Sequence, residues 1–378
     1  MIDLLSHFRS RQGSILDDIR SLVEIESPTT KPEGTTRITS YFAEQYESIG
    51  ATVRLYPTEH GAHLVARANL DAPASAGPIM LLGHVDTVWP TGTFAEYPFR
   101  VEDGKAFGPG IFDMKSGTVL MLEVIRAIKD FSIKLSHPTV VFLSCDEESG
   151  GITSRTLIEA EARNCSGVLV LEPPLPGGVL KTERKGISSF QIKTHGVPSH
   201  AGLDPEKGVS AIAEMAHQIL ELHKMNDLAA GISVNVGVVN GGTYSNVVAA
   251  EAVAEVDVRY RTRLQAQEIT ERIKQLRPVV KGGTIEVISG LSRPPLERTA
   301  DVISLFEKAK QVAAGLGFEL REGSVGGGSD GNFTAALGIP TLDGLGVDGN
   351  GAHAKHEHIV IDDIPRRAAL LTGLLSML

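Results

Sequence analysis

The stretch PTVVFLSCDEESGG, Pro138–Gly151, joins an apolar run to a cluster of acidic residues. The run Val140–Leu143 fits a buried strand, and Asp146, Glu147 and Glu148 follow it before small residues lead into a helical pattern. Adjacent glutamates at the end of a buried strand repel each other and lose hydration, which raises the free energy of their charged forms. The stretch therefore predicts either a positive charge nearby or a solvated acidic loop at a helix N-terminus.

Two other apolar runs end in the same way. Pro78–Leu82 precedes His84 and Asp86, and Val168–Leu171 precedes Glu172. Continuous apolar runs alternate with helical patterns in this half of the chain, so we predict an α/β fold: a mixed, largely parallel sheet with helices on both faces. Ligands of such sheets bind beyond the carboxyl ends of the strands. The polar side chains that follow these runs are therefore expected to meet.

The pattern changes between residues 178 and 291, where openly alternating strands are interrupted by two helical patterns. This order predicts an inserted α+β domain with an antiparallel sheet, between two parts of the α/β domain at residues 1–177 and 292–378. Within the inserted domain we expect a helix over Pro205–Met225. In the second part of the α/β domain we expect a strand over Phe318–Arg321.

Composition narrows the classes of function. The 378 residues include 36 Lys+Arg and 46 Asp+Glu, and the net charge of −10 argues against a nucleic-acid partner. None of the apolar runs approaches the roughly 20 residues that span a membrane. The N-terminal stretch is charged throughout and lacks the apolar core of a signal peptide, so we expect a cytoplasmic protein that does not enter the membrane. The two cysteines, Cys145 and Cys165, form no paired motif and fit buried apolar positions.

Two further candidate ligands lie in glycine-rich loops, Asp113 in residues 108–113 and His353 in residues 349–353. The carboxylates expected to lie close together are then Asp86, Asp113, Glu147, Glu148 and Glu172. Such a cluster stays ionised only if cations occupy it, and two divalent ions would offset most of its charge. Histidine and carboxylate ligands suit Zn²⁺, with Co²⁺ or Mn²⁺ as alternatives.

Each candidate also fits an ordinary structural role. His84 could be a hydrogen-bonded histidine at a strand end, Asp113 the N-cap of the following helix, and Glu172 a strand-end charge. Asp86 projects to the same side of an extended chain as His84, so it could orient the imidazole or be a plain turn residue. The fragment AHAKHEH at residues 352–358 offers three histidines, of which at most one or two can be functional.

Taken together, the residues resemble the M20 family of metallopeptidases and deacylases, and most closely its glutamate carboxypeptidase branch. The matching segments occur in the family's order and cover nearly the whole chain. They are GHVDTV (83–88), FGPGIFDMKSG (107–117), DEESG (146–150), LEP (171–173), GVPSHAGLDPEKGVSAI (196–212), GGTYSNVV (241–248), VDVRY (256–260), GGGSD (326–330) and GAHAKHE (351–357). His-x-Asp alone is a weak signal, whereas the ordered set is specific.

The resemblance implies a site for two zinc ions. The ligands would be His84, Asp113 and Glu172 for one ion, and Asp113, Glu148 and His353 for the other. Asp113 would bridge the two ions, and the family has a cis peptide bond after this aspartate, here Asp113–Met114. The family's last histidine ligand is followed four residues later by a glutamate, and His353 and Glu357 match this spacing.

The resemblance also assigns Glu147 as the general base. A water that bridges two zinc ions has a strongly lowered pKa, so Glu147 would take its proton, and the hydroxide would attack an amide carbonyl. Glu147 would then return the proton to the leaving amine. The oxyanion needs hydrogen-bond donors, and in the family one of them is a lid-domain histidine of the neighbouring subunit. His200 matches that histidine, although it also fits a turn residue, and the match implies a homodimer formed through the inserted domain.

Residues that would bind the substrate are less clearly marked. Asn246 and Arg259 match positions that contact the substrate in relatives, where the arginine binds the terminal carboxylate. A planar guanidinium suits such a carboxylate because it can donate two parallel hydrogen bonds. Arg259 also fits a structural ion pair in mid-strand. Gly328 lies in a loop before a helix, whose backbone N–H groups could bind an anion. Arg293 is a further candidate, in a stretch (SRPPL) that departs from the pattern of glutamate-specific relatives.

We therefore expect a dizinc metallohydrolase that removes a C-terminal amino acid, with glutamate as one candidate, from a peptide or N-acyl substrate. The alternative is an N-acyl-amino-acid deacylase of the same fold, of the acetylornithine deacetylase or aminoacylase type. A third alternative is that the protein binds carboxylates without catalysing a reaction. The presence of Glu147, Glu148 and Asp113 argues against it, because a decayed site usually loses its base or a ligand.

Overall fold

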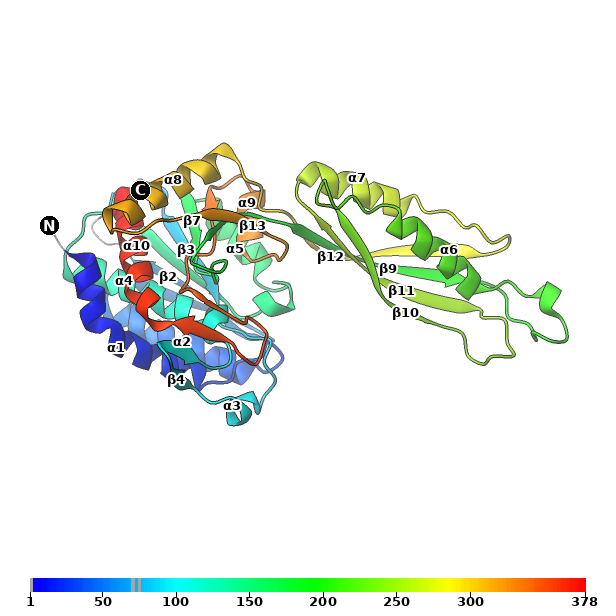
Figure 1. The fold of residues 1–378 in the computed structure, drawn as a ribbon, viewed down its shortest axis with the longest axis horizontal. Coiled ribbons are helices and arrows are strands. Elements are labelled where there is room, and N and C mark those ends of the chain that lie inside the picture. Colours follow the sequence, from blue (N-terminus) through cyan, green and yellow to red (C-terminus); the bar gives the residue numbers. More distant parts are fainter. Residues whose placement is uncertain (1–2, 69–71, 74–75) are drawn as a thin grey trace. The chain divides into compact units, whose positions relative to one another are not determined.

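A computed structural model describes residues 3–68, 72–73 and 76–378. The chain divides into two compact units. Unit 1 comprises Met1–Thr182, Arg298–Ser324 and Ser329–Leu378, and unit 2 comprises Glu183–Glu297 and Val325–Gly328. In Figure 1 the elements labelled β9 to β12, α6 and α7 belong to unit 2.

The central sheet of unit 1 has six strands among the described residues. Their order is β1 (Thr52–Thr58), β2 (Gly61–Ala68), β6 (Thr139–Ser144), β3 (Ile79–His84), β7 (Gly167–Val170) and β14 (Thr341–Leu342). The pairs from β6 to β14 are parallel, whereas β1–β2 and β2–β6 are antiparallel. Every residue of β3, β6 and β7 is buried, as their continuous apolar runs predict. The predicted mixed, largely parallel sheet is confirmed.

Helices cover both faces of this sheet. On one face, alternate strand residues such as Leu81 and Val141 pack in a large core with α1 (Leu4–Val23), α2 (Pro32–Ser48), α4 (Ser116–Asp130), α8 (Ala300–Gly315) and α10 (Ile364–Met377). On the other face, residues such as Met80 and Phe142 pack with α5 (Arg155–Ala162) and α9 (Gly331–Ala336). The period of two along the strands thus supplies two apolar surfaces.

Smaller elements complete unit 1. The short helix α3 covers Thr93–Glu96. One small sheet has the order β15 (Gly349–Asn350), β16 (His358–Val360), β5 (Lys105–Phe107) and β4 (Arg100–Glu102). A second pair joins β8 (Leu180–Arg184) to β13 (Glu322–Val325), and in each of these strands the chain passes between unit 1 and unit 2. Among the helices that the structure describes, none is long and apolar enough to cross a membrane.

Unit 2, which lies wholly within the described residues, is built on an antiparallel sheet. Its four strands have the order β10 (Ser233–Gly241), β11 (Glu251–Tyr260), β9 (Gly186–His195) and β12 (Thr284–Arg293). Alternate residues of β11 are buried, and they share an apolar core with α6 (Ala211–His223) and α7 (Arg263–Lys274). This arrangement leaves one face of the sheet without those helices.

Two predicted elements are wrong in position. The helix expected over Pro205–Met225 begins only at Ala211, because the Ser210 side chain accepts the Ala213 N–H at 3.1 Å and caps the helix there. The strand expected over Phe318–Arg321 begins at Glu322. The N–H of Phe318 instead bonds to the carbonyl of Ala313 at 3.1 Å and closes the end of α8.

Candidate metal centre

The polar residues that follow three buried strands lie at one edge of the unit 1 sheet. His84 is the last residue of β3, Glu148 lies in a one-turn helix just after β6, and Glu172 follows β7. Because β3 pairs in parallel with both β6 and β7, their carboxyl ends point the same way. Sheet topology thus gathers these side chains from separate parts of the sequence.

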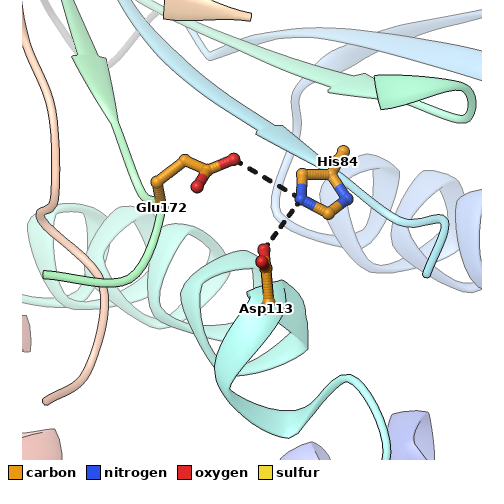
Figure 2. Close-up of side chains that lie close together, drawn as sticks. All are labelled: His84, Asp113 and Glu172. Carbon is orange, nitrogen blue, oxygen red and sulfur yellow. Dashed lines mark hydrogen bonds and ion pairs between the residues drawn. The ribbon is translucent and has the colours of Figure 1, made fainter. Parts of the chain in front are cut away.

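The first ligand group consists of His84, Asp113 and Glu172. Figure 2 shows the three side chains pointing toward one another. The Nε2 atom of His84 lies 3.1 Å from Oδ1 of Asp113 and 3.5 Å from Oε1 of Glu172. His84 is only 1% exposed and Glu172 is also buried. A histidine nitrogen and two carboxylate oxygens therefore face a common point in the interior.

The second ligand group consists of Asp113, Glu148 and His353. The Nε2 atom of His353 lies 3.4 Å from Oδ2 of Asp113 and 3.4 Å from Oε2 of Glu148. Asp113 therefore turns one oxygen to each histidine. In each group, the candidate ligand atoms lie within 4.8 Å of one another. The structure brings the five sequence-predicted metal ligands together in two groups that share Asp113.

The local backbone around Asp113 fits a ligand better than a helix cap. Helix α4 begins at Ser116 with Lys115 at its N-cap position, so Asp113 lies outside the cap. The peptide bond Asp113–Met114 is cis, as the family resemblance implies. Gly110, with φ of +72°, turns the chain into this segment. The alternative role of Asp113 as an N-cap is therefore wrong.

The donor set fits divalent cations. The Oε1 atom of Glu148 is buried and has no hydrogen-bond partner among the described residues. A buried carboxylate oxygen without a partner is costly, and a bound cation would satisfy it. One imidazole and two carboxylates in each group are ligands that suit zinc, with cobalt or manganese as alternatives.

The charges of the two groups affect each other strongly. Burial opposes protonation of His84, yet the hydrogen bonds to Asp113 and the neighbouring carboxylates raise its pKa well above the usual value. Hydrogen bonds to Asp113 and Glu148 raise the pKa of His353 to about 10. Burial, aided by the charge of Asp113, raises the pKa of Glu148 to about 7. Metal binding at these groups is therefore expected to compete with protonation of the histidines.

Asp86 contacts both the His84 imidazole and the turn that follows β6. Its backbone carbonyl lies 2.9 Å from Nδ1 of His84, whereas its nearest carboxylate oxygen is 3.5 Å away. The carboxylate instead accepts the backbone N–H groups of Glu147 and Glu148, each at 3.1 Å. It also accepts the hydroxyl of Thr29 at 2.6 Å. Asp86 therefore ties the strand end of His84 to the turn of Glu147 and Glu148.

The turn that presents Glu147 is short and closed by glycine. Glu147–Ser149 form a single 3₁₀ turn, and Gly150 and Gly151 follow with φ of +101° and +70°. The N–H of Gly150 bonds to the carbonyl of Glu147 at 2.8 Å. Positive φ favours glycine, which explains the Ser-Gly-Gly sequence after the acidic pair. The half-buried Glu147 thus stands directly beside a ligand of the second group.

The other predicted site residues belong to unit 2. His200 and Asn246 are exposed and lie on adjacent segments, since the N–H of Ala201 bonds to the carbonyl of Asn246 at 2.9 Å. The Nδ1 atom of His200 accepts the N–H groups of Gly202 and Leu203 at 3.1 and 3.2 Å. This pattern assigns the imidazole proton of neutral His200 to Nε2, which can then act as a donor.

Arg259 makes the ion pair that its mid-strand position allowed. Its Nε and Nη2 atoms donate to the two carboxylate oxygens of Asp257 at 2.8 and 3.0 Å. Asp257 precedes it by two residues on β11, so both side chains lie on one face of the strand. Arg293 is buried, and its side chain lies so close to Gly328 that a Cβ there would be 2.8 Å from the Arg293 Cδ.

The sequence argument missed two residues that support the ligand groups. Thr29 binds Asp86, and the indole of Trp89 donates to the carboxylate of Glu357 at 2.7 Å. Both partners are distant in sequence. Thr29 lies in the polar SPTT segment between α1 and α2, which by pattern is an ordinary turn. Trp89 directly follows the GHVDTV motif, and this neighbourhood is the one feature of the sequence that points to a role near the ligands.

The chain is similar to known peptidases. Residues 80–377 match the family described as Peptidase family M20/M25/M40. Over 377 residues the chain is 31% identical to carboxypeptidase G2 of Pseudomonas sp. (strain RS-16), covering 96% of this chain and 89% of that protein. The fold is similar to that of aminopeptidase PepT from Bacillus cereus ATCC 10987, with a TM-score of 0.78, 24% identity, and 97% and 98% of the two chains covered. It is also similar to the YXEP protein of Bacillus subtilis, described as a dinuclear metal binding peptidase from the M20 family (TM-score 0.71, 14% identity, 98% of each chain).

Proposed function

Because the chain belongs to peptidase family M20/M25/M40, we propose that it is a two-metal hydrolase that removes a C-terminal amino acid from a peptide or N-acyl substrate. The resemblance to the M20 family seen in the sequence is confirmed, and the 31% identity to carboxypeptidase G2 agrees with it. The observation that supports the two-metal proposal best is the position of Asp113, whose two oxygens face the two histidines of different ligand groups.

In this proposal His84, Asp113 and Glu172 hold one divalent ion, and Asp113, Glu148 and His353 hold the other. Zinc suits this donor set best. When bound, the two ions would polarise the scissile carbonyl and lower the pKa of the attacking water.

Glu147 is the proposed general base and acid. It stands beside Glu148 and belongs to neither ligand group, so in this proposal its carboxylate moves a proton rather than binding an ion. It would accept a proton from the attacking water and deliver that proton to the leaving amine. Asp86 holds the backbone of Glu147 by accepting its N–H at 3.1 Å. The turn would therefore keep the base in place while the proton moves in both directions.

His200 is the proposed donor to the oxyanion that forms at the scissile carbonyl. Its Nδ1 atom is engaged by two backbone N–H groups, which leaves the Nε2–H to be donated. We propose that it acts on the active site of a partner subunit in a homodimer, with unit 2 as the dimerisation and lid domain. The exposure of His200 in a single chain is consistent with this role.

Substrate selection is proposed to involve Asn246, Arg259, Arg293 and Gly328. The likeness to carboxypeptidase G2 supports a substrate with a free C-terminal carboxylate. Arg259 would have to share its guanidinium between Asp257 and that carboxylate, since both of its hydrogen bonds to Asp257 are short. The fold likeness to an aminopeptidase, at 24% identity, supports the fold alone.

The substrate class can be tested directly with the full chain reconstituted with Zn²⁺, Co²⁺ or Mn²⁺. The panel would contain peptidyl and N-acyl derivatives of glutamate, alanine, leucine and arginine, with C-terminal amides as matched controls. We expect release of the C-terminal amino acid, loss of turnover with the amides, and about two ions per chain by elemental analysis. Preference for short acyl groups would favour the deacylase alternative. Full activity without metal, or release of the N-terminal residue, would contradict the proposal.

A further inference from the structure

Glu357 lies in unit 1, and its carboxylate is held by the N–H groups of one side chain and three backbone positions. The residue is 3% exposed, and its carboxylate accepts four hydrogen bonds from described residues. Oε2 accepts the indole N–H of Trp89 at 2.7 Å and the backbone N–H of Gly110 at 2.8 Å. Oε1 accepts the backbone N–H groups of Phe112 and Asp113 at 2.9 and 3.0 Å. All four partners are donors, so both oxygens act only as acceptors.

The three backbone donors belong to the loop that presents Asp113, the residue shared by both ligand groups. Glu357 itself closes the loop of His353, because its N–H bonds to the carbonyl of Ala354 at 2.9 Å. Its own carbonyl accepts the N–H of Gly108 at 3.4 Å, at the other end of the Asp113 loop. One residue therefore connects the backbone of Asp113 with the backbone of His353.

We propose that Glu357 is a positioning residue for the second metal ion, holding the Asp113 and His353 loops at the spacing that the ion requires. This inference rests on the proposed two-metal function. The first ion depends on it less, because His84 and Glu172 are buried beside strand ends of the central sheet. For the second ion, two of the three ligands lie on the loops that Glu357 connects.

The substitution Glu357→Gln tests this role with little change in shape. An amide has one acceptor oxygen, and its NH₂ group would face two of the four donors. At least two hydrogen bonds are then lost, and the loops are expected to move apart. Outer partners that orient metal ligands typically change metal affinity about 10–100-fold. We expect a loss of that size for the second ion, with the first ion bound nearly as in the wild type.

Unit 2 offers a matched control in Glu214. This glutamate is fully buried and accepts the backbone N–H groups of Val279 and Val280 at 2.9 and 2.6 Å. It also accepts the side-chain amide of Gln218 at 2.6 Å. Its environment resembles that of Glu357, but the loop it holds contains none of the proposed ligands. Glu214→Gln should lower thermal stability and leave both metal affinities unchanged.

The experiment is a titration of the metal-free full chain with Zn²⁺, in competition with a chromophoric chelator, for wild type, Glu357→Gln and Glu214→Gln. Unchanged second-ion affinity in Glu357→Gln, or an equal loss in Glu214→Gln, would overturn the inference. If Glu357→Gln does not fold, Trp89→Phe decides, because it removes one donor from Oε2. Trp89→Phe should lower the affinity for the second ion several-fold. An affinity equal to that of the wild type would overturn the positioning role of Glu357. A wild type that binds fewer than two ions would contradict the proposed function instead.

Discussion

The two ligand groups contain the same number of side chains, but the chain holds them differently. His84 and Glu172 lie beside the ends of buried strands, and the side chain of His84 is 1% exposed. His353 lies on a loop, and its side chain is 52% exposed. Its φ of +62° is in the left-handed region, which residues other than glycine seldom adopt. Only Asp113 belongs to both groups.

This difference predicts different affinities. The backbone on either side of the first group is fixed by sheet hydrogen bonds, such as Val85 N–H to Ser144 at 2.9 Å and Leu171 N–H to Leu82 at 3.0 Å. The entropy of ordering those ligands is lost when the chain folds, so binding an ion there orders little further. The exposed side chain of His353 keeps more freedom until an ion binds. We therefore expect the first group to retain its ion longer than the second.

Glu147→Gln should have the largest effect on turnover and the smallest on metal content. It removes the proton acceptor without changing the size of the side chain, so kcat should fall about 10²–10⁴-fold. Both ions should remain, since Glu147 belongs to neither ligand group. The measurements are kcat with the best substrate and elemental analysis of the same preparation. Loss of an ion would show that Glu147 is itself a metal ligand, and the two ligand groups would then have to be assigned again.

The same variant can show whether His200 acts across subunits. His200→Ala should lower kcat while both ions remain, because the histidine lies in unit 2 and outside both ligand groups. In a mixed dimer of Glu147→Gln and His200→Ala, one active site would combine an intact base with an intact donor. Co-expression should therefore restore part of the activity. No restoration would show that His200 acts within its own chain or not at all.

Removing one histidine from each group tests the predicted difference in affinity. His353→Ala should leave about one ion per chain after dialysis against a weak chelator, because the first group is intact. Its thermal unfolding should stay close to that of the wild type, since the removed side chain is half-exposed. His84→Ala should lose the first ion and also lower the unfolding temperature, because it leaves a cavity in the interior. If His353→Ala lost both ions, the groups would not be independent in the way that their burial implies.

The strand-end ligands could be predicted because each follows an apolar run that stops abruptly. His84, Glu148 and Glu172 follow such runs, and parallel strands bring their ends to one edge. Asp113 and His353 lie on loops, where local sequence gives no comparable signal, and their assignment to ligand groups came from the family resemblance. The ion pair of Arg259 could be predicted from the sequence, because Asp257 lies two residues earlier on the same face of the strand.

The hydrogen bonds that hold the ligands could not be predicted. Glu357 binds the N–H of Phe112, which is 245 residues away, and Asp86 binds Thr29 across 57 residues. Almost every residue has a backbone N–H, so a side chain that accepts one leaves no pattern in the partner's sequence. Only the folded arrangement of the loops identifies these partners.

Thr29→Val is the mildest of these substitutions, and we expect it to change metal binding in the second group but not in the first. Its hydroxyl donates to Asp86 at 2.6 Å, and Asp86 in turn holds the N–H groups of Glu147 and Glu148. Valine keeps the shape and removes the donor, so Asp86 gains freedom to turn. The loss of a buried hydrogen bond to a charged group should lower the free energy of unfolding by about 1.5–3 kcal/mol.

We expect Thr29→Val to lower the affinity for the second ion about tenfold, which is the lower end of the range for residues that orient metal ligands. The first ion should bind as in the wild type, because His84 Nδ1 contacts the backbone carbonyl of Asp86, which the substitution leaves in place. Thr29→Ser keeps the hydroxyl and should restore the second affinity. Zn²⁺ titration of the three metal-free proteins measures both affinities. Equal weakening of the two ions, or no rescue by serine, would mean that the turn of Glu148 is held by the fold as a whole rather than by this hydroxyl.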